Sequence, residues 1–123
     1  MRRPSLPLEP RASVFGVVPP GETLKIEFLF WEECPSHPEA LALLRDVMEA
    51  HGIADPIDVR EVLTHEEAVE LRFPGSPTIR VDGQDVDADG AEWPPGLSCR
   101  VYRLPDGRPS PVPSRQQLEE AFA

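Results

Sequence analysis

The sequence is short of cysteine, of positive charge and of long apolar runs. Two of its 123 residues are cysteine, and 12 Lys and Arg stand against 22 Asp and Glu, for a formal net charge of -10. This deficit of basic residues argues against nucleic acid and against an anionic membrane surface as partners, because both attract basic faces. No apolar run approaches the roughly 20 residues that a bilayer crossing needs. The length suits a single domain.

The N-terminal segment also lacks the apolar stretch of a secretory leader. Prolines at positions 4, 7 and 10, together with Glu9, interrupt the residues that follow Arg2 and Arg3. We therefore expect no signal peptide. Two cysteines in an acidic chain without a leader favour a cytoplasmic protein with reduced thiols over a disulfide-stabilised secreted one.

Proline, by contrast, is abundant and unevenly spread. There are 16 prolines, five of them in the first twenty residues and six between Pro94 and Pro113. A polar segment broken by prolines buries too little apolar surface to offset the entropy of ordering it. The sequence therefore predicts a proline-rich, disordered N-terminal arm over residues 1–23 and one folded domain over residues 24–123.

The domain alternates strand and helix patterns. Leu24 to Trp31 has apolar residues at every second position and more on its other face, which predicts a strand inside a sheet. Periodicity, caps and turn signals predict the remaining elements: a helix over 38–50 ended by Gly52, a strand over 57–63, a helix over 65–72 capped by Thr64 and Glu67, strands over 78–81 and 84–86 joined at Asp82-Gly83, a strand over 99–104, and a helix from Ser114 to Phe122. This order predicts a small three-layer α/β domain.

Cys34 is the residue best placed for chemistry. It follows the first predicted strand at the start of the helix, where Pro35 suits the first helical position. The unpaired N–H groups and positive dipole end of a helix favour thiolate over thiol, whereas the adjacent Glu32 and Glu33 disfavour a second anion. The alternative is a buried cysteine that only fills space in the core.

Two motifs resemble the thioredoxin and glutaredoxin superfamily. They are Cys34-Pro35-Ser36-His37, between strand and helix, and Ser76-Pro77-Thr78, at the entry to the hairpin. The resemblance covers residues 24–86 and the last helix. It implies a thioredoxin-like three-layer fold, with a mixed sheet of four or five strands flanked by helices.

The same resemblance implies how a substrate is held. Pro77 would be cis and lie against Cys34, leaving the backbone of residue 76 free to pair with an extended thiol substrate. We therefore predict substrate contacts from five residues: Trp31, Pro35, Ser76, Pro77 and Thr78. Trp31 and Trp93 could wall a shallow apolar groove beside them.

His37 stands where the dithiol motif of that superfamily has its second cysteine, so Cys34 cannot form the usual disulfide. His37 is a catalytic candidate as a cation or proton donor beside the sulfur, or a metal ligand. The alternative is a solvent-facing histidine in the first helical turn.

Cys99 is the remaining candidate partner for Cys34. If residues 84–86 return along the third strand, the loop over 87–98 can deliver Cys99 near Cys34. If residues 99–104 are the returning strand, Cys99 begins at the far end of the sheet and the pair fails. A disulfide needs Cα atoms within about 7 Å, and the sequence leaves both routes open.

Five acidic residues near the hairpin are placed somewhat like oxygen ligands for calcium, but the closing glutamate of a calcium loop is missing. We predict a solvated loop and no metal site there: Asp82, Asp85, Asp87, Asp89 and Glu92.

Thiol chemistry is the leading functional hypothesis. Cys34 would attack as a thiolate, and Cys99 or a small thiol such as glutathione or mycothiol would resolve the mixed disulfide. The partner would be a protein or small-molecule thiol or disulfide, with no other cofactor. The alternative is a non-catalytic module that binds protein or peptide in the cis-proline groove. A third hypothesis is handling of mercury or zinc through Cys34, His37 and Cys99.

Overall fold

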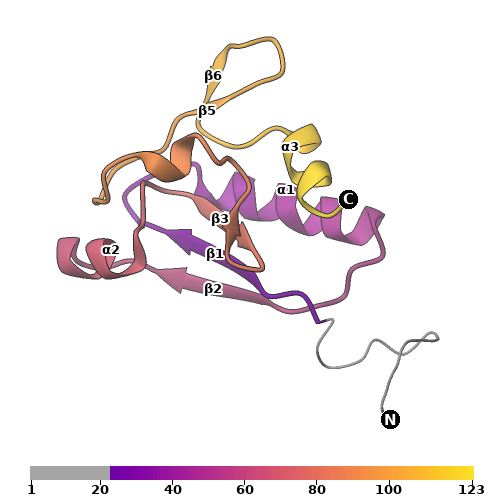
Figure 1. Ribbon diagram of the computed structural model, residues 1–123, viewed down its shortest axis with the longest axis horizontal. Coiled ribbons are helices and arrows are strands. Elements are labelled where there is room, and N and C mark those ends of the chain that lie inside the picture. Colours follow the sequence, from indigo (N-terminus) through magenta and orange to yellow (C-terminus); the bar gives the residue numbers. More distant parts are fainter. Residues whose placement is uncertain (1–22) are drawn as a thin grey trace.

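A four-stranded mixed sheet forms the centre of the domain. The computed structural model describes residues 23–123, so the predicted arm, apart from Thr23, lies outside the described residues. Strand β1 (Ile26–Phe30) runs parallel to β2 (Ile57–Glu61) and antiparallel to β3 (Thr78–Val81), which pairs in turn with β4 (Gln84–Asp85). The strand order is β2-β1-β3-β4 (Figure 1). The described residues therefore have a mixed α/β fold, as predicted.

Helices α1 (His37–Ala50) and α3 (Arg115–Ala121) lie together over one face of the sheet (Figure 1). The alternating residues Ile26 and Phe28 of β1 point into this layer with Ile79 of β3. Leu44 of α1 and Leu118 of α3 close over them, each fully buried. This layer is the main core, because it removes most of the large apolar side chains from water.

A second, smaller core lies on the opposite side of β1. Leu29 points away from α1 and packs with Val62, with Phe73 and with Ala68 of α2 (His65–Leu71). Of the two apolar residues that follow β2, Val62 is buried and Leu63 is 66 % exposed. The two faces of β1 are thus both covered, as expected for an inner strand.

Local sequence signals place most element ends correctly. Asp82 and Gly83 both have positive φ, 53° and 82°, as a two-residue hairpin turn requires. Gly52 follows α1 with φ 69°. Thr64 Oγ1 accepts the Glu67 N–H at 3.1 Å, while the Glu67 carboxylate accepts the Leu63 N–H rather than that of Thr64. At α3, Ser114 Oγ accepts the Gln117 N–H at 3.1 Å.

Helix α1 agrees with the predicted range of 38–50 to within one residue, but Cys34 and Pro35 do not lie where the sequence placed them. The helix begins at His37, with Ser36 as N-cap and Pro38 in the first turn. Cys34 and Pro35 lie in the preceding turn, where the Cys34 N–H donates to the Trp31 carbonyl at 3.0 Å. Pro35 is therefore not the first helical residue, and Cys34 is not itself at the helix terminus.

The predicted strand over residues 99–104 is correct only for two of its residues. Only β5 (Tyr102–Arg103) is a strand, and it pairs with β6 (Pro109–Ser110) in a separate two-stranded hairpin. Residues 98–100 do not form a strand, because their backbone hydrogen bonds join them to one residue only, Ser76, in an isolated bridge. A short 3₁₀ helix, η2 (Gly90–Glu92), precedes them. No helix within residues 23–123 has the length and apolarity to span a bilayer.

The packing of α3 can be tested with one substitution. Leu118→Ala removes a fully buried side chain and should lower the free energy of unfolding by about 2–5 kcal/mol. The matched control is Leu63→Ala, which truncates an exposed leucine and should change stability by less than about 0.5 kcal/mol. Urea titration followed by circular dichroism measures both. Equal stabilities of the two variants would exclude α3 from the core.

Candidate functional site

The sulfur of Cys34 lies in a buried pocket of polar groups. The turn after β1 carries Cys34 inward, and its side chain is 1 % exposed. Its thiol donates to the Ser76 carbonyl oxygen at 3.5 Å and lies 3.5 Å from Ser36 Oγ. The side chain is thus as buried as that of a space-filling cysteine, but its sulfur has two polar neighbours.

Ser76 joins the end of β1 to the start of β3. Its Oγ accepts the Trp31 N–H at 2.9 Å. The Ser76–Pro77 peptide bond is cis, as the resemblance implies. Thr78 Oγ1 donates to the Gly75 carbonyl at 2.7 Å. The segment is thus fixed on both sides of Pro77.

Residues 98–100 run alongside Ser76 and bring Cys99 to the same place. The Ser76 N–H donates to the Ser98 carbonyl, and the Ser76 carbonyl accepts the Arg100 N–H, each at 2.8 Å. Cys99 is therefore the partner of Ser76 in a parallel bridge. Of the two routes left open by the sequence, the chain takes the one in which the loop after β4 returns Cys99 towards Cys34.

This pairing corrects the predicted substrate site. The backbone of residue 76 is not free for an extended substrate, because residues 98 and 100 use both its N–H and its carbonyl. The side chains of Ser76, Pro77 and Thr78 are fully buried. Of the five predicted contacts, Pro35 is exposed and Trp31 half-buried.

The two thiols have opposite tendencies to ionise. Burial opposes ionisation of Cys34, but hydrogen bonds with Cys99, Ser36 and Ser76 outweigh it and lower the pKa of Cys34. The hydrogen bond with Cys34 raises the pKa of Cys99 to about 11, with burial and the charge of Cys34 acting in the same direction. Hydrogen bonds, rather than a helix terminus, therefore favour the thiolate at Cys34.

A buried ion pair beside Cys99 was not predicted. Arg100 donates to both carboxylate oxygens of Asp85, at 2.7 and 2.8 Å. The two side chains are 1 % and 5 % exposed, so Asp85 does not belong to the solvated loop expected from the acidic cluster. The signal available in the sequence was an arginine next to a candidate cysteine, which alone does not identify its partner.

The other predicted catalytic residue, His37, faces different neighbours. Its ring stacks on Phe30 at 4.5 Å between centroids, and Nε2 lies 3.7 Å from Glu32 Oε1. The side chain is 18 % exposed, so it is not the fully solvent-facing histidine of the alternative prediction. Within residues 23–123, no three His, Cys, Asp or Glu side chains form a group that could hold a metal ion.

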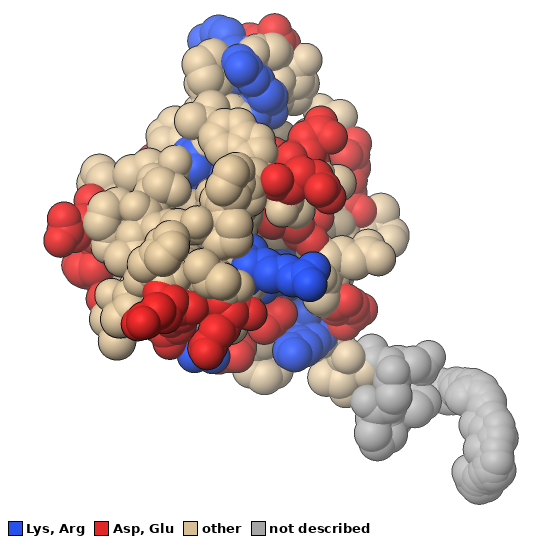
Figure 2. Space-filling model, turned by 60° about the vertical axis from the view of Figure 1, so that its left-hand side comes forward, with Lys and Arg blue, Asp and Glu red and all other residues tan. Residues whose placement is uncertain are grey.

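The two tryptophans do not form one groove. Trp31 packs against the smaller core, whereas Trp93 lines a concavity of about 520 Å³ with Val101 and Arg103. Figure 2 shows a largely uncharged surface on the side facing the viewer, with acidic side chains at its left, lower and right edges and basic side chains at its top and right. Charged residues of both signs therefore lie around this surface.

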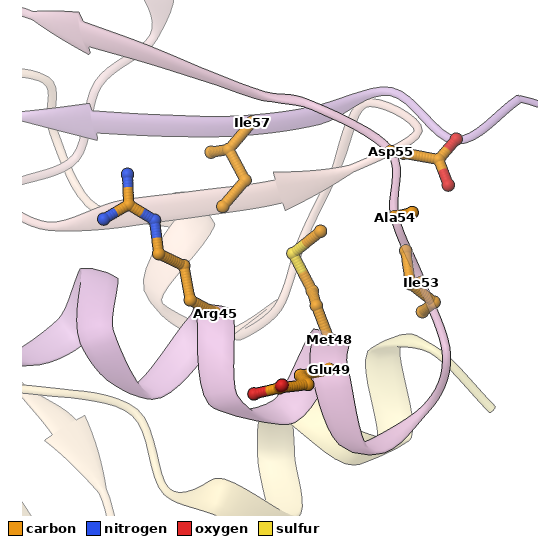
Figure 3. A pocket seen from close by; sticks show the side chains of 7 residues that line it. All are labelled: Arg45, Met48, Glu49, Ile53, Ala54, Asp55 and Ile57. Carbon is orange, nitrogen blue, oxygen red and sulfur yellow. The ribbon is translucent and has the colours of Figure 1, made fainter.

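A further concavity, of about 360 Å³, lies at the other end of α1 from Cys34 (Figure 3). In Figure 3, Arg45 and Met48 rise from the helix towards Ile57 at the start of β2. The predicted site residues take no part in it. It is lined by Arg45, Met48, Glu49, Ile53, Ala54, Asp55 and Ile57.

The influence of Cys99 on the pKa of Cys34 can be tested by two replacements of Cys99. Cys99→Ala removes the donor, so the pKa of Cys34 should rise; Cys99→Ser keeps a hydroxyl donor, so the pKa should stay low. Thiolate absorbance as a function of pH measures Cys34 alone, since each variant has one cysteine. Identical titration curves for the two variants would contradict the hydrogen bond.

The reciprocal variant tests the other thiol. Cys34→Ala removes the partner that raises the pKa of Cys99, so Cys99 should ionise below its wild-type value of about 11. An unchanged value would mean that burial alone sets the pKa of Cys99. The same absorbance titration gives the answer.

Comparison with known proteins gives no relative: the chain matches no protein-family model, no curated protein and no solved structure.

Proposed function

We propose that the protein is a thiol–disulfide oxidoreductase with a thioredoxin-like fold, in which Cys34 is the nucleophile and Cys99 the resolving thiol. The observation that carries this proposal is the meeting of both cysteines at Ser76. The sulfur of Cys34 contacts the Ser76 carbonyl. The backbone of Cys99 lies beside Ser76, at the usual strand spacing of about 4.8 Å. Both cysteines thus lie at the same residue, and the pKa of each is shifted by the other.

The division of roles follows from the pKa values. Thiolates, not thiols, attack disulfides, and the pKa of Cys34 is lowered while that of Cys99 is raised. A lower pKa also makes Cys34 the better leaving group when an external thiol opens the pair. Cys34 is therefore suited both as the attacking nucleophile and as the leaving group in thiol–disulfide exchange.

The proposed oxidation has two steps. The Cys34 thiolate attacks one sulfur of a small disulfide, RSSR, to form Cys34–S–S–R and release RS⁻. Cys99 then loses its proton to solvent and attacks the Cys34 sulfur, which forms the Cys34–Cys99 disulfide and releases a second RS⁻. Two protein thiols are oxidised, and RSSR is reduced to two thiols.

Exposure restricts the reaction partners. Cys34 is 1 % exposed and Cys99 is exposed. The first step therefore requires the turn that carries Cys34 to open until a disulfide reaches its sulfur, and a small disulfide such as that of glutathione or mycothiol needs the least opening. In the reverse direction an external thiolate meets Cys99 first, attacks its sulfur and releases Cys34 as the thiolate.

Two further observations bear on the choice between the hypotheses. The four-stranded mixed sheet flanked by helices supports a thioredoxin-like fold. A peptide-binding module would use the backbone N–H and carbonyl of Ser76, but both are already hydrogen-bonded to residues 98 and 100. This favours thiol chemistry over peptide binding.

Glutathione disulfide provides the direct test. Wild-type protein should lose two hydrogen masses without gaining glutathione, because Cys99 resolves the adduct. Cys99→Ser should instead keep one glutathione on Cys34, and Cys34→Ser should react far more slowly, since it lacks the thiol whose pKa is lowered. Mass spectrometry of the intact chain distinguishes the three. Equal reaction rates of wild type and Cys34→Ser would refute the proposal.

A further inference from the structure

We propose that Arg100 is a positioning residue: its guanidinium, held by Asp85 beneath Gly90, keeps the Ser98–Arg100 segment against Ser76 and so holds the Cys99 sulfur at Cys34. This inference deepens the proposed thiol–disulfide function and rests on it. It assigns a role to a buried charge that the exchange reaction itself does not use.

The backbone gives the first part of the argument. Two hydrogen bonds to Ser76, from the residues on either side of Cys99, fix the peptide units that flank it. Successive side chains of an extended segment point in opposite directions. Cys99 faces Cys34, so Arg100 points away from it into the protein. The placement of Cys99 therefore depends on what holds Arg100 on the other side.

The guanidinium is held by several groups at once. Besides the two bonds to Asp85, it donates to Thr78 Oγ1 at 3.2 Å and to the Asp87 carbonyl at 3.0 Å. Its Cζ lies 4.7 Å from the centre of the Tyr102 ring, and the Tyr102 hydroxyl donates to the Pro77 carbonyl at 2.6 Å. The side chains of residues 100 and 102 thus bind Thr78 and Pro77, while the backbone of Ser76 pairs with residues 98 and 100.

Stability alone does not account for this arrangement. Removing a guanidinium and a carboxylate from water costs free energy that their attraction only partly returns, so apolar residues often stabilise as well or better. What a fork-shaped guanidinium adds is a fixed geometry, since it pairs with a carboxylate through two parallel bonds. Here that geometry fixes the residue next to a reactive thiol.

Gly90 offers a way to move the guanidinium without replacing it. A Cβ on Gly90 would lie 2.5 Å from Arg100 Nη2 and 2.9 Å from Nε, so Gly90→Ala must displace the guanidinium. The matched control is Gly96→Ala in the same loop, where the nearest atom to a Cβ is His65 Nδ1 at 4.0 Å. Both variants keep every residue that contacts either sulfur.

The experiment measures two quantities in the full chain. The first is the equilibrium constant for forming the Cys34–Cys99 disulfide with glutathione disulfide, which reports the effective concentration of one thiol at the other. The second is the pKa of Cys34, read from the transition at lower pH in the thiolate absorbance of the two cysteines; this pKa depends on Cys99 and needs no redox reaction to measure.

Gly90→Ala should lower the disulfide equilibrium constant about tenfold, which corresponds to about 1.4 kcal/mol, and raise the pKa of Cys34. Gly96→Ala should change neither. A purely structural role for Arg100 would lower the thermal midpoint of Gly90→Ala but leave the disulfide equilibrium constant at its wild-type value, and that result overturns the inference.

Failure of the proposed function is a separate outcome. If wild-type protein forms no intramolecular disulfide, the oxidoreductase proposal fails. The positioning role is then decided by the pKa of Cys34 alone, where equal values in Gly90→Ala and Gly96→Ala refute it.

Arg100→Lys is the second variant. It keeps the positive charge but loses the two-pronged pairing with Asp85, so it should shift both quantities in the same direction as Gly90→Ala. If circular dichroism shows that Arg100→Lys does not fold, Gly90→Ala remains decisive.

Discussion

The site depends on one contact, the pairing of Ser76 with the segment that contains Cys99. Two backbone hydrogen bonds join a turn at the end of the sheet to a loop more than twenty positions further along the chain. Without them, Cys34 would face only Ser36 and the Ser76 carbonyl. With them, the two cysteines of the chain share one small polar region, and each sets the ionisation of the other.

Local signals in the sequence predicted much of the fold. The alternation in β1, the Asp82-Gly83 turn and the cap at Ser114 act over a few residues, so their structural outcome can be inferred without knowing the rest of the molecule. The same holds for the identification of Cys34 as the candidate nucleophile, which rested on a strand followed by a turn and a helix.

The environment of Cys99 could not be inferred in this way. Residues 99–104 have the composition of a strand, but whether a segment joins a sheet depends on which distant edge is unpaired. Asp85 looked like one of several exposed acidic residues because its partner is fifteen positions away. Residues 98–100 return to the sheet from a distant part of the chain. Their backbone covers Ser76, and the side chain of Arg100 pairs with the buried Asp85.

The separation of the two cysteines has a consequence for the topology of the oxidised protein. Cys34 and Cys99 are 65 positions apart, so a bond between them would close a covalent ring that contains α1, β2, α2, β3 and β4. Closing a ring of this size removes conformational freedom from the denatured chain worth about 4 kcal/mol in the chain-entropy description. Oxidation would therefore strengthen the whole domain against denaturation, and the resistance of the domain to proteolysis would report the redox state of its surroundings.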